Sequence, residues 1–150
     1  MRKAWLILSA LVIIRCDLIW HLQLEGTDQD SSMIMYEGFK ARIQMTTIGN
    51  RNFAVGIDIF AMDDILIYTD RLRVLVENRE VEYTVRLSTI KLENYVVKAA
   101  RDEEKNIYYN FDAGELSTGD KISIFADKYI SYGEQFYNID TLVFLLPEDY

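Results

Sequence analysis

The residue types that carry most enzyme chemistry are scarce in this sequence. It has one cysteine, Cys16, and one histidine, His21, and both lie near the beginning of the chain. A serine or cysteine nucleophile needs an imidazole held by a rigid scaffold, and a structural zinc site needs four ligands, chiefly cysteine and histidine. The glycine-rich motifs that cradle phosphates are also missing from the sequence. We therefore predict that the protein is not an enzyme and holds no metal and no cofactor.

Carboxylates are the remaining groups that could act as acid and base. They gather at Asp63-Asp64, at Asp102-Glu103-Glu104, and at Asp112 with Glu115. Glycoside cleavage needs two carboxyl groups about 5 to 10 Å apart across a cleft, whereas these clusters fall where the sequence predicts turns. We expect charged turn residues in solvent, with a carboxylate-based enzyme acting on glycans as the less favoured alternative.

The segment DQDSS, residues 28–32, begins like an oxygen-ligand loop for calcium. It then departs from the EF-hand pattern, because Met33 stands at the required glycine and Phe39 at the bidentate glutamate. We therefore predict no calcium site in this segment.

The chain opens with MRKAWLILSALVIIRC, in which eleven uncharged residues (4–14) follow a short cationic start. A membrane-spanning helix needs roughly 20 apolar residues, so the run has the length of a signal sequence. With Cys16 directly behind it, the segment resembles the leader of a bacterial lipoprotein, although Arg15 fills the place of a small residue. The resemblance implies a signal peptide at residues 1–15 and lipid attachment at Cys16. An ordinary cleaved secretory signal, an uncleaved anchor and a buried strand are the alternatives.

The composition indicates one globular domain with an acidic surface. The 150 residues are half apolar and carry a formal net charge of −8. Without Arg2, Lys3 and Arg15, 13 basic residues face 24 acidic ones, which gives −11. Such a surface repels phosphate backbones, so we expect no nucleic-acid partner. With Cys16 as the only cysteine, an internal disulfide is excluded as well.

The pattern from residue 40 onward is typical of β-strands separated by short polar turns. Apolar and polar residues alternate in EVEYTVRL (80–87), and LRVLV (72–76) precedes it. Because Asn tolerates positive φ, we predict a β-hairpin over residues 72–87 with its turn at Asn78-Arg79. Further strands are predicted at residues 41–48, 53–60, 65–68, 95–99, 107–111, 121–126 and 141–146.

Strands at this regular spacing predict an all-β fold, an antiparallel β-sandwich. We favour an immunoglobulin-like Greek key, with a small β-barrel as the alternative. The stretch LSTGDKISIFAD (116–127) resembles the approach to a late strand in many bacterial immunoglobulin-like modules. The predicted organisation is a signal peptide at 1–15, an N-terminal tether at 16–32 and a single β-sandwich domain at 33–150.

Aromatic residues are concentrated in KYISYGEQFYN, residues 128–138, which would connect two predicted strands. Recognition loops use aromatic rings for contact area, so Tyr129, Tyr132 and Tyr137 are our candidate binding residues. We expect Phe136, which has no polar group, to be buried, and Tyr132-Gly133 to form the tip of a turn. In the alternative, these rings cap the open end of the core.

These inferences predict a non-enzymatic, extracytoplasmic binding or interaction module of a bacterial cell envelope, tethered through lipid on Cys16. Its expected partners are the membrane and a protein or glycan ligand. One alternative is a structural subunit that assembles by edge-strand pairing, and another is a secreted protein.

Overall fold

The computed structural model describes residues 19–49, 51–146 and 148. The predicted signal peptide and Cys16 lie outside the described residues. Within the described ranges no helix is long and apolar enough to span a membrane.

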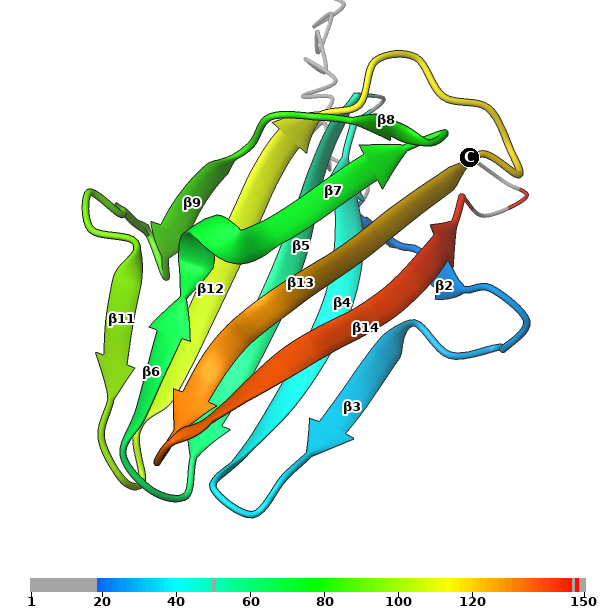
Figure 1. Cartoon of the computed structure of the whole chain (residues 1–150). Coiled ribbons are helices and arrows are strands. Elements are labelled where there is room, and N and C mark those ends of the chain that lie inside the picture. Colours follow the sequence, from blue (N-terminus) through cyan, green and yellow to red (C-terminus); the bar gives the residue numbers. More distant parts are fainter. Residues whose placement is uncertain (1–18, 50, 147, 149–150) are drawn as a thin grey trace, which may run out of the picture.

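Two antiparallel sheets pack face to face (Figure 1). The first sheet contains β1 (Ile19–His21), β3 (Ser31–Met35), β4 (Phe39–Ile48), β5 (Asn52–Ala61), β9 (Thr84–Leu87), β10 (Ile90–Lys91) and β12 (Glu104–Asp112). The second contains β2 (Gln23–Leu24), β6 (Ile65–Tyr68), β7 (Leu72–Val76), β8 (Arg79–Glu80), β11 (Val96–Ala99), β13 (Lys121–Tyr132) and β14 (Gln135–Leu145). A 3-10 turn, η1 (Thr69–Arg71), separates β6 from β7.

The order of the long strands is that of an immunoglobulin constant-type sandwich. Its first, second, fifth and fourth strands form one sheet, and its third, sixth and seventh form the other. Here β4, β5, β12 and β9 lie side by side in the first sheet. In the second sheet β13 lies between β14 and the interrupted strand formed by β6 and β7. The predicted Greek key is confirmed. The barrel alternative is wrong, because no pairing of described strands joins the two sheets.

The core fills the space between the sheets with aliphatic side chains. Strands β4 and β5 pair in regular register, with Ile43 opposite Ile57 and Met45 opposite Val55, and these four side chains are fully buried. Burying an aliphatic side chain of this size contributes about 1.5–3 kcal/mol. Because the chain has one cysteine, this packing carries the stability without an internal disulfide.

The N-terminal segment differs from the predicted tether. Strand β1 pairs with β4, β2 pairs with β14, and β3 returns to β4. Between the first two, Leu22 is buried in the core and its N–H donates to the carbonyl of Met45 at 3.0 Å. The folded domain therefore includes residues 19–32, and the boundary predicted at residue 33 is too late.

The predicted hairpin over residues 72–87 forms only at its tip. Glu77 and Asn78 both have positive φ, 47° and 63°, as a two-residue type I′ turn requires, and β7 pairs with β8 only as far as Glu80. The chain then crosses to the first sheet, where β9 pairs with β12. Residues 80–87 keep their alternation of burial through the crossing, because the core lies between the sheets. The sequence pattern therefore could not show the change of sheet.

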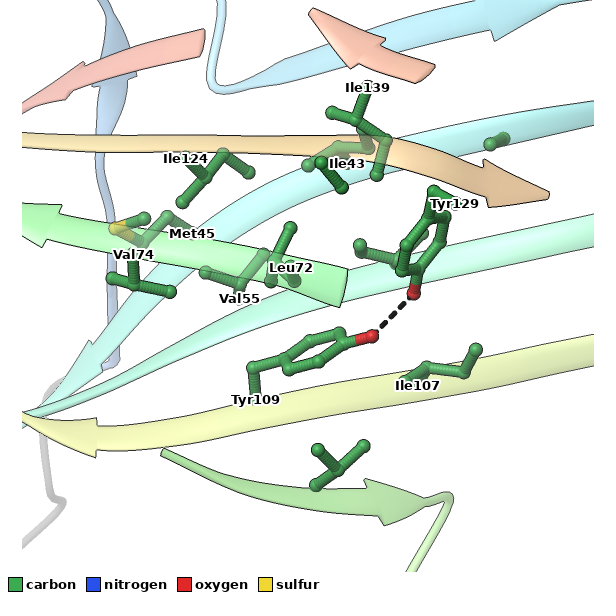
Figure 2. Close-up of a cluster of buried hydrophobic side chains, with 14 of the residues drawn as sticks. Ile43, Met45, Val55, Leu72, Val74, Ile107, Tyr109, Ile124, Tyr129 and Ile139 are labelled. Atoms are coloured by element: carbon green, nitrogen blue, oxygen red, sulfur yellow. Dashed lines mark hydrogen bonds between the residues drawn. The ribbon is translucent and has the colours of Figure 1, made fainter. Parts of the chain in front are cut away.

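Two tyrosines join the sheets through the middle of the core (Figure 2). Tyr109 on β12 and Tyr129 on β13 are completely buried, and their hydroxyl oxygens lie 2.6 Å apart in a hydrogen bond. Burial raises the pKa of both phenols well above the ordinary value, which keeps both hydroxyls protonated. Each hydroxyl is thus the hydrogen-bond partner of the other, in a region that contains few other polar groups.

We expect Tyr109→Phe and Tyr129→Phe each to lower the free energy of unfolding by about 1–3 kcal/mol, because each leaves a buried hydroxyl without its partner. The double variant should cost clearly less than the sum of the two losses. Urea unfolding measures all three. Tyr108→Phe, the neighbouring half-buried tyrosine on β12, is the control and should change stability by less than about 0.5 kcal/mol. Strictly additive losses would contradict the pairing.

Candidate functional site

The aromatic segment 128–138 is not a loop. Strands β13 and β14 continue through it and meet at a tight turn after Tyr132. Gly133 has a φ of +60°, so the predicted turn tip at Tyr132-Gly133 is confirmed. The candidate rings therefore project from paired strands, whose two faces point in opposite directions.

A β-bulge in β13 determines which of these rings point inward. Ala126 pairs with Ile139 and Ile130 pairs with Tyr137, so three residues of β13 face a single residue of β14. Within the bulge Lys128 has a φ of +52°, and its N–H donates to Oδ1 of Asn138 at 2.7 Å. Bulges of this kind redirect side chains.

Two irregularities of this hairpin reverse two of our predictions, namely the bulge in β13 and an extra residue in β14 between Leu142 and Ile139. Tyr129, expected at the surface, is fully buried against Tyr109 and cannot contact a ligand. Phe136, expected in the core, is 48% exposed and pairs with Ser131 across the hairpin. A strictly alternating strand would place every second residue on one face. The bulge in β13 breaks this alternation at Tyr129, and the extra residue of β14 shifts it before the strand reaches Phe136.

The other two candidate rings cap the end of the core. Tyr132 lies against Gly38, where an added Cβ would come within 2.7 Å of the ring carbons. Tyr137 packs on Tyr36 and Phe39, with ring centres 4.4 and 5.3 Å apart. Both tyrosines are half-buried. The capping role that we considered as the alternative therefore describes them.

A different group of side chains forms the candidate site, on the outer face of the second sheet. We call it the Phe136 cluster, and it consists of Tyr68, Arg71, Lys128 and Phe136. The guanidinium of Arg71 lies 4.0 Å from the ring centre of Tyr68 and 5.7 Å from that of Phe136. Nζ of Lys128 also lies 5.7 Å from the Phe136 ring centre. These distances are those of cation–π contacts.

Two backbone irregularities position the cations. Arg71 ends the 3-10 turn η1, which is anchored by the buried Thr69 through hydrogen bonds to the carbonyl of Tyr95. Nη1 of Arg71 donates to the carbonyl of Lys128 at 2.6 Å. The turn and the bulge are thus joined directly, and both cations are held beside Phe136.

Neither cation of the cluster has an acidic partner in the described part of the chain. The ion pairs there involve other basic residues, namely Arg51, Arg73, Arg101, Lys105 and Lys121. Apolar surface continues beside the cluster, since Leu66 and Val96 are exposed on the adjoining strands β6 and β11. The site therefore combines positive charge with exposed apolar surface on an acidic protein.

An open groove of about 820 Å³ begins at Arg71 and follows β7. Its lining carries both signs of charge, with Asp70 and Asp127 beside Arg73, which forms an ion pair with Glu80. The rest of the lining consists of Glu82 and of aromatic and apolar side chains, among them Phe125, Tyr83 and Val81.

Several of the carboxylates considered for acid–base chemistry hold turns together. Oδ1 of Asp64 accepts from the N–H of Arg101 at 3.1 Å, and Asp63 pairs with the Arg101 guanidinium at 3.5 Å. Asp112 accepts from the N–H of Gly114 at 2.8 Å, and this bond holds the pKa of Asp112 below its usual value. In the described ranges no three His, Cys, Asp or Glu side chains gather where they could hold a metal ion.

No family model and no curated protein matches the sequence. The solved structures similar to this one include the GAE domain of GGA2p from Saccharomyces cerevisiae, with a TM-score of 0.47 and 10% identity over 79% of this chain and 98% of that one. The yeast GGA1 GAE domain has a TM-score of 0.36 and 14% identity, covering 78% and 98%. These values are too low to relate this chain to the function of those domains.

Gly38 tests the packing of Tyr132 at the end of the core. We expect Gly38→Ala to cost about 1–3 kcal/mol of unfolding free energy, because the new methyl group would overlap the Tyr132 ring. Thermal or urea unfolding measures the loss. Gly56→Ala is the matched control, since its Cβ would meet the nearest side chain at 3.4 Å. Equal effects of the two substitutions would show that Tyr132 does not pack tightly on Gly38.

Proposed function

We propose that the protein is a non-enzymatic interaction module that binds an acidic segment of a partner protein at the Phe136 cluster. The observation that carries this proposal is the exposed Phe136 ring between Arg71 and Lys128, two cations without a carboxylate partner in the described residues. On a chain of net charge −8, such a local positive site attracts negative charge selectively.

The composition of the cluster supports binding to protein. Aromatic side chains and arginine are enriched at the energetic centres of protein interfaces. Because Arg71 is held by the carbonyl of Lys128 and stacked on Tyr68, little side-chain freedom is lost when a ligand binds.

The adjacent groove favours a peptide over a uniformly anionic polymer. Asp70, Asp127 and Glu80 line it together with Arg71 and Arg73, so a nucleic acid or an acidic polysaccharide would meet repulsion along it. A protein segment can present acidic side chains to the cluster and other groups to the groove. This arrangement also supports a protein ligand over the glycan that the sequence left open.

We further propose that the module is extracytoplasmic and tethered by lipid on Cys16 in a bacterial cell envelope. The support is the lipoprotein-like leader together with the start of β1 at Ile19, three residues after Cys16. Three residues of extended chain span at most about 10 Å. A lipid on Cys16 would therefore hold the sandwich close to the membrane surface.

Charge reversal tests the peptide-binding site. We expect a labelled peptide of glutamate and phenylalanine to bind the protein, and its lysine counterpart to bind more weakly. Lys128→Glu should reduce binding of the acidic peptide at least tenfold, a loss of about 1.4 kcal/mol, without changing the melting temperature. Fluorescence anisotropy measures binding. Lys91→Glu on β10 makes the same charge change on the first sheet and should retain binding. If both variants lost the same amount of binding, net charge alone would explain the loss, and the proposed binding site would be refuted.

Mass spectrometry of the mature N-terminus tests the tether. We expect the protein expressed in a bacterium to partition into detergent and to carry a mass increase of acyl-chain size on Cys16. Cys16→Ser should remove the modification and leave an uncleaved precursor or a released protein. A mature N-terminus beyond Cys16 without lipid would refute the tether and leave the binding site unaffected.

A further inference from the structure

Strand β3 is the least protected edge of the sandwich. Natural sheets defend their edges with charge, proline, bulges or very short strands. In the described part of the chain, β1 is three residues long and β2, β8 and β10 are two residues long. Strand β11 contains Lys98, and β14 has a bulge and Asp140. Strand β3 reads SSMIM and pairs with β4 over five residues without interruption. It therefore has none of these defences.

The backbone of β3 offers a regular row of free groups. The N–H of Tyr36 donates to the carbonyl of Phe39, and in an antiparallel pair every second residue makes such bonds. Ile34 and Ser32 consequently bond to β4, whereas the N–H and C=O groups of Met35, Met33 and Ser31 point away from it. No described backbone group outside the strand pairing bonds to these three residues.

Two of these three positions carry exposed apolar side chains. Met33 is 58% exposed and Met35 is 71% exposed. Their cross-strand partners on β4 are Arg42 and Lys40. The methionines therefore form an uncharged edge of the sheet next to basic side chains. Methionine packs well against irregular partners, and an added strand would cover both side chains.

We propose that β3 pairs with β3 of a second copy, antiparallel and centred on Met33, so that the two first sheets join into one. In this register Met33 faces Met33 of the other copy, and Met35 faces Ser31. All of these residues have their free backbone groups on the open side, so the register fits the hydrogen-bonding alternation of both strands. In this register the free backbone groups of Ser31, Met33 and Met35 in each copy all face a residue of the other copy with free backbone groups.

The charges near the strand are compatible with a second copy as the occupant in this register. The strand has no charged residue, and the flanking acids do not oppose one another, because Asp30 of one copy falls opposite Tyr36 of the other. The remaining repulsion comes from the net charge of −8 on each copy and is screened by salt. Association should therefore strengthen between about 0.1 M and about 1 M salt, where the Debye length falls from ~10 to ~3 Å.

The first test introduces a charge at Met33, where the two-fold axis of the proposed dimer passes, and measures association of the full chain by sedimentation. Met33→Glu places two carboxylates face to face in the dimer, whereas in the monomer the new carboxylate gains Arg42 as a cross-strand partner. We expect at least a tenfold loss in the association constant and an unchanged melting temperature. Ile90→Glu on β10, at a side chain that is also 71% exposed, is the matched control and should still dimerise. A monomeric wild type, or an undiminished Met33→Glu dimer, would overturn the proposal.

Cross-linking gives a second test that does not depend on the first variant. Directly opposed residues in a hydrogen-bonded pair have Cα atoms about 5.5 Å apart, within the range that a disulfide bridges. In a Cys16→Ser background, Met33→Cys should form a disulfide-linked dimer on mild oxidation, and Ile90→Cys should not. Absence of the Met33→Cys dimer, or equal cross-linking of the two, would refute pairing at β3. Because the Phe136 cluster lies on the other sheet, either result leaves the peptide-binding proposal intact.

Discussion

Between Ala126 and Ile130, β13 accommodates three residues opposite one residue of β14, and this bulge governs both the interior and the outer surface of the second sheet. On the inner side it directs Tyr129 to the hydroxyl of Tyr109. On the outer side it exposes the carbonyl of Lys128, which fixes Arg71. One irregularity thus produces the polar link between the sheets and the geometry of the Phe136 cluster, so the core and the candidate site are mechanically connected.

The fold could be predicted from the sequence to the extent that alternation of apolar residues records burial. The predicted segments fall on the strands of a Greek-key sandwich because each long strand has one face toward a single core. The same logic failed over residues 72–87, since β7 and β9 both alternate between buried and exposed residues although they belong to different sheets. Alternation reports which face is buried, and it carries no information about the neighbouring strand.

The site was harder to predict for two physical reasons. Placing Tyr129 required knowledge of the bulge in β13, where Lys128 has a positive φ that its residue type does not suggest. Placing Phe136 required knowledge of the extra residue in β14 between Leu142 and Ile139. The cluster also depends on Tyr68 and Arg71, which lie about sixty residues earlier in the chain and approach only through the pairing of β6 and β7 with β13. The concentration of aromatic residues in the last hairpin indicated the right region and the wrong side chains.

The placement of β2 has a consequence for the synthesis of the protein. Gln23 and Leu24 pair with Leu145 and Phe144, so residues made among the first can reach their partners only after almost the whole described chain has left the ribosome. Until β14 has emerged, β2 has no partner strand, and the sheet that covers the apolar face of the β4–β5 hairpin is incomplete. The sandwich therefore closes late in synthesis, because the second sheet is not complete before the last strand emerges. Until then the nascent chain exposes apolar surface that can aggregate.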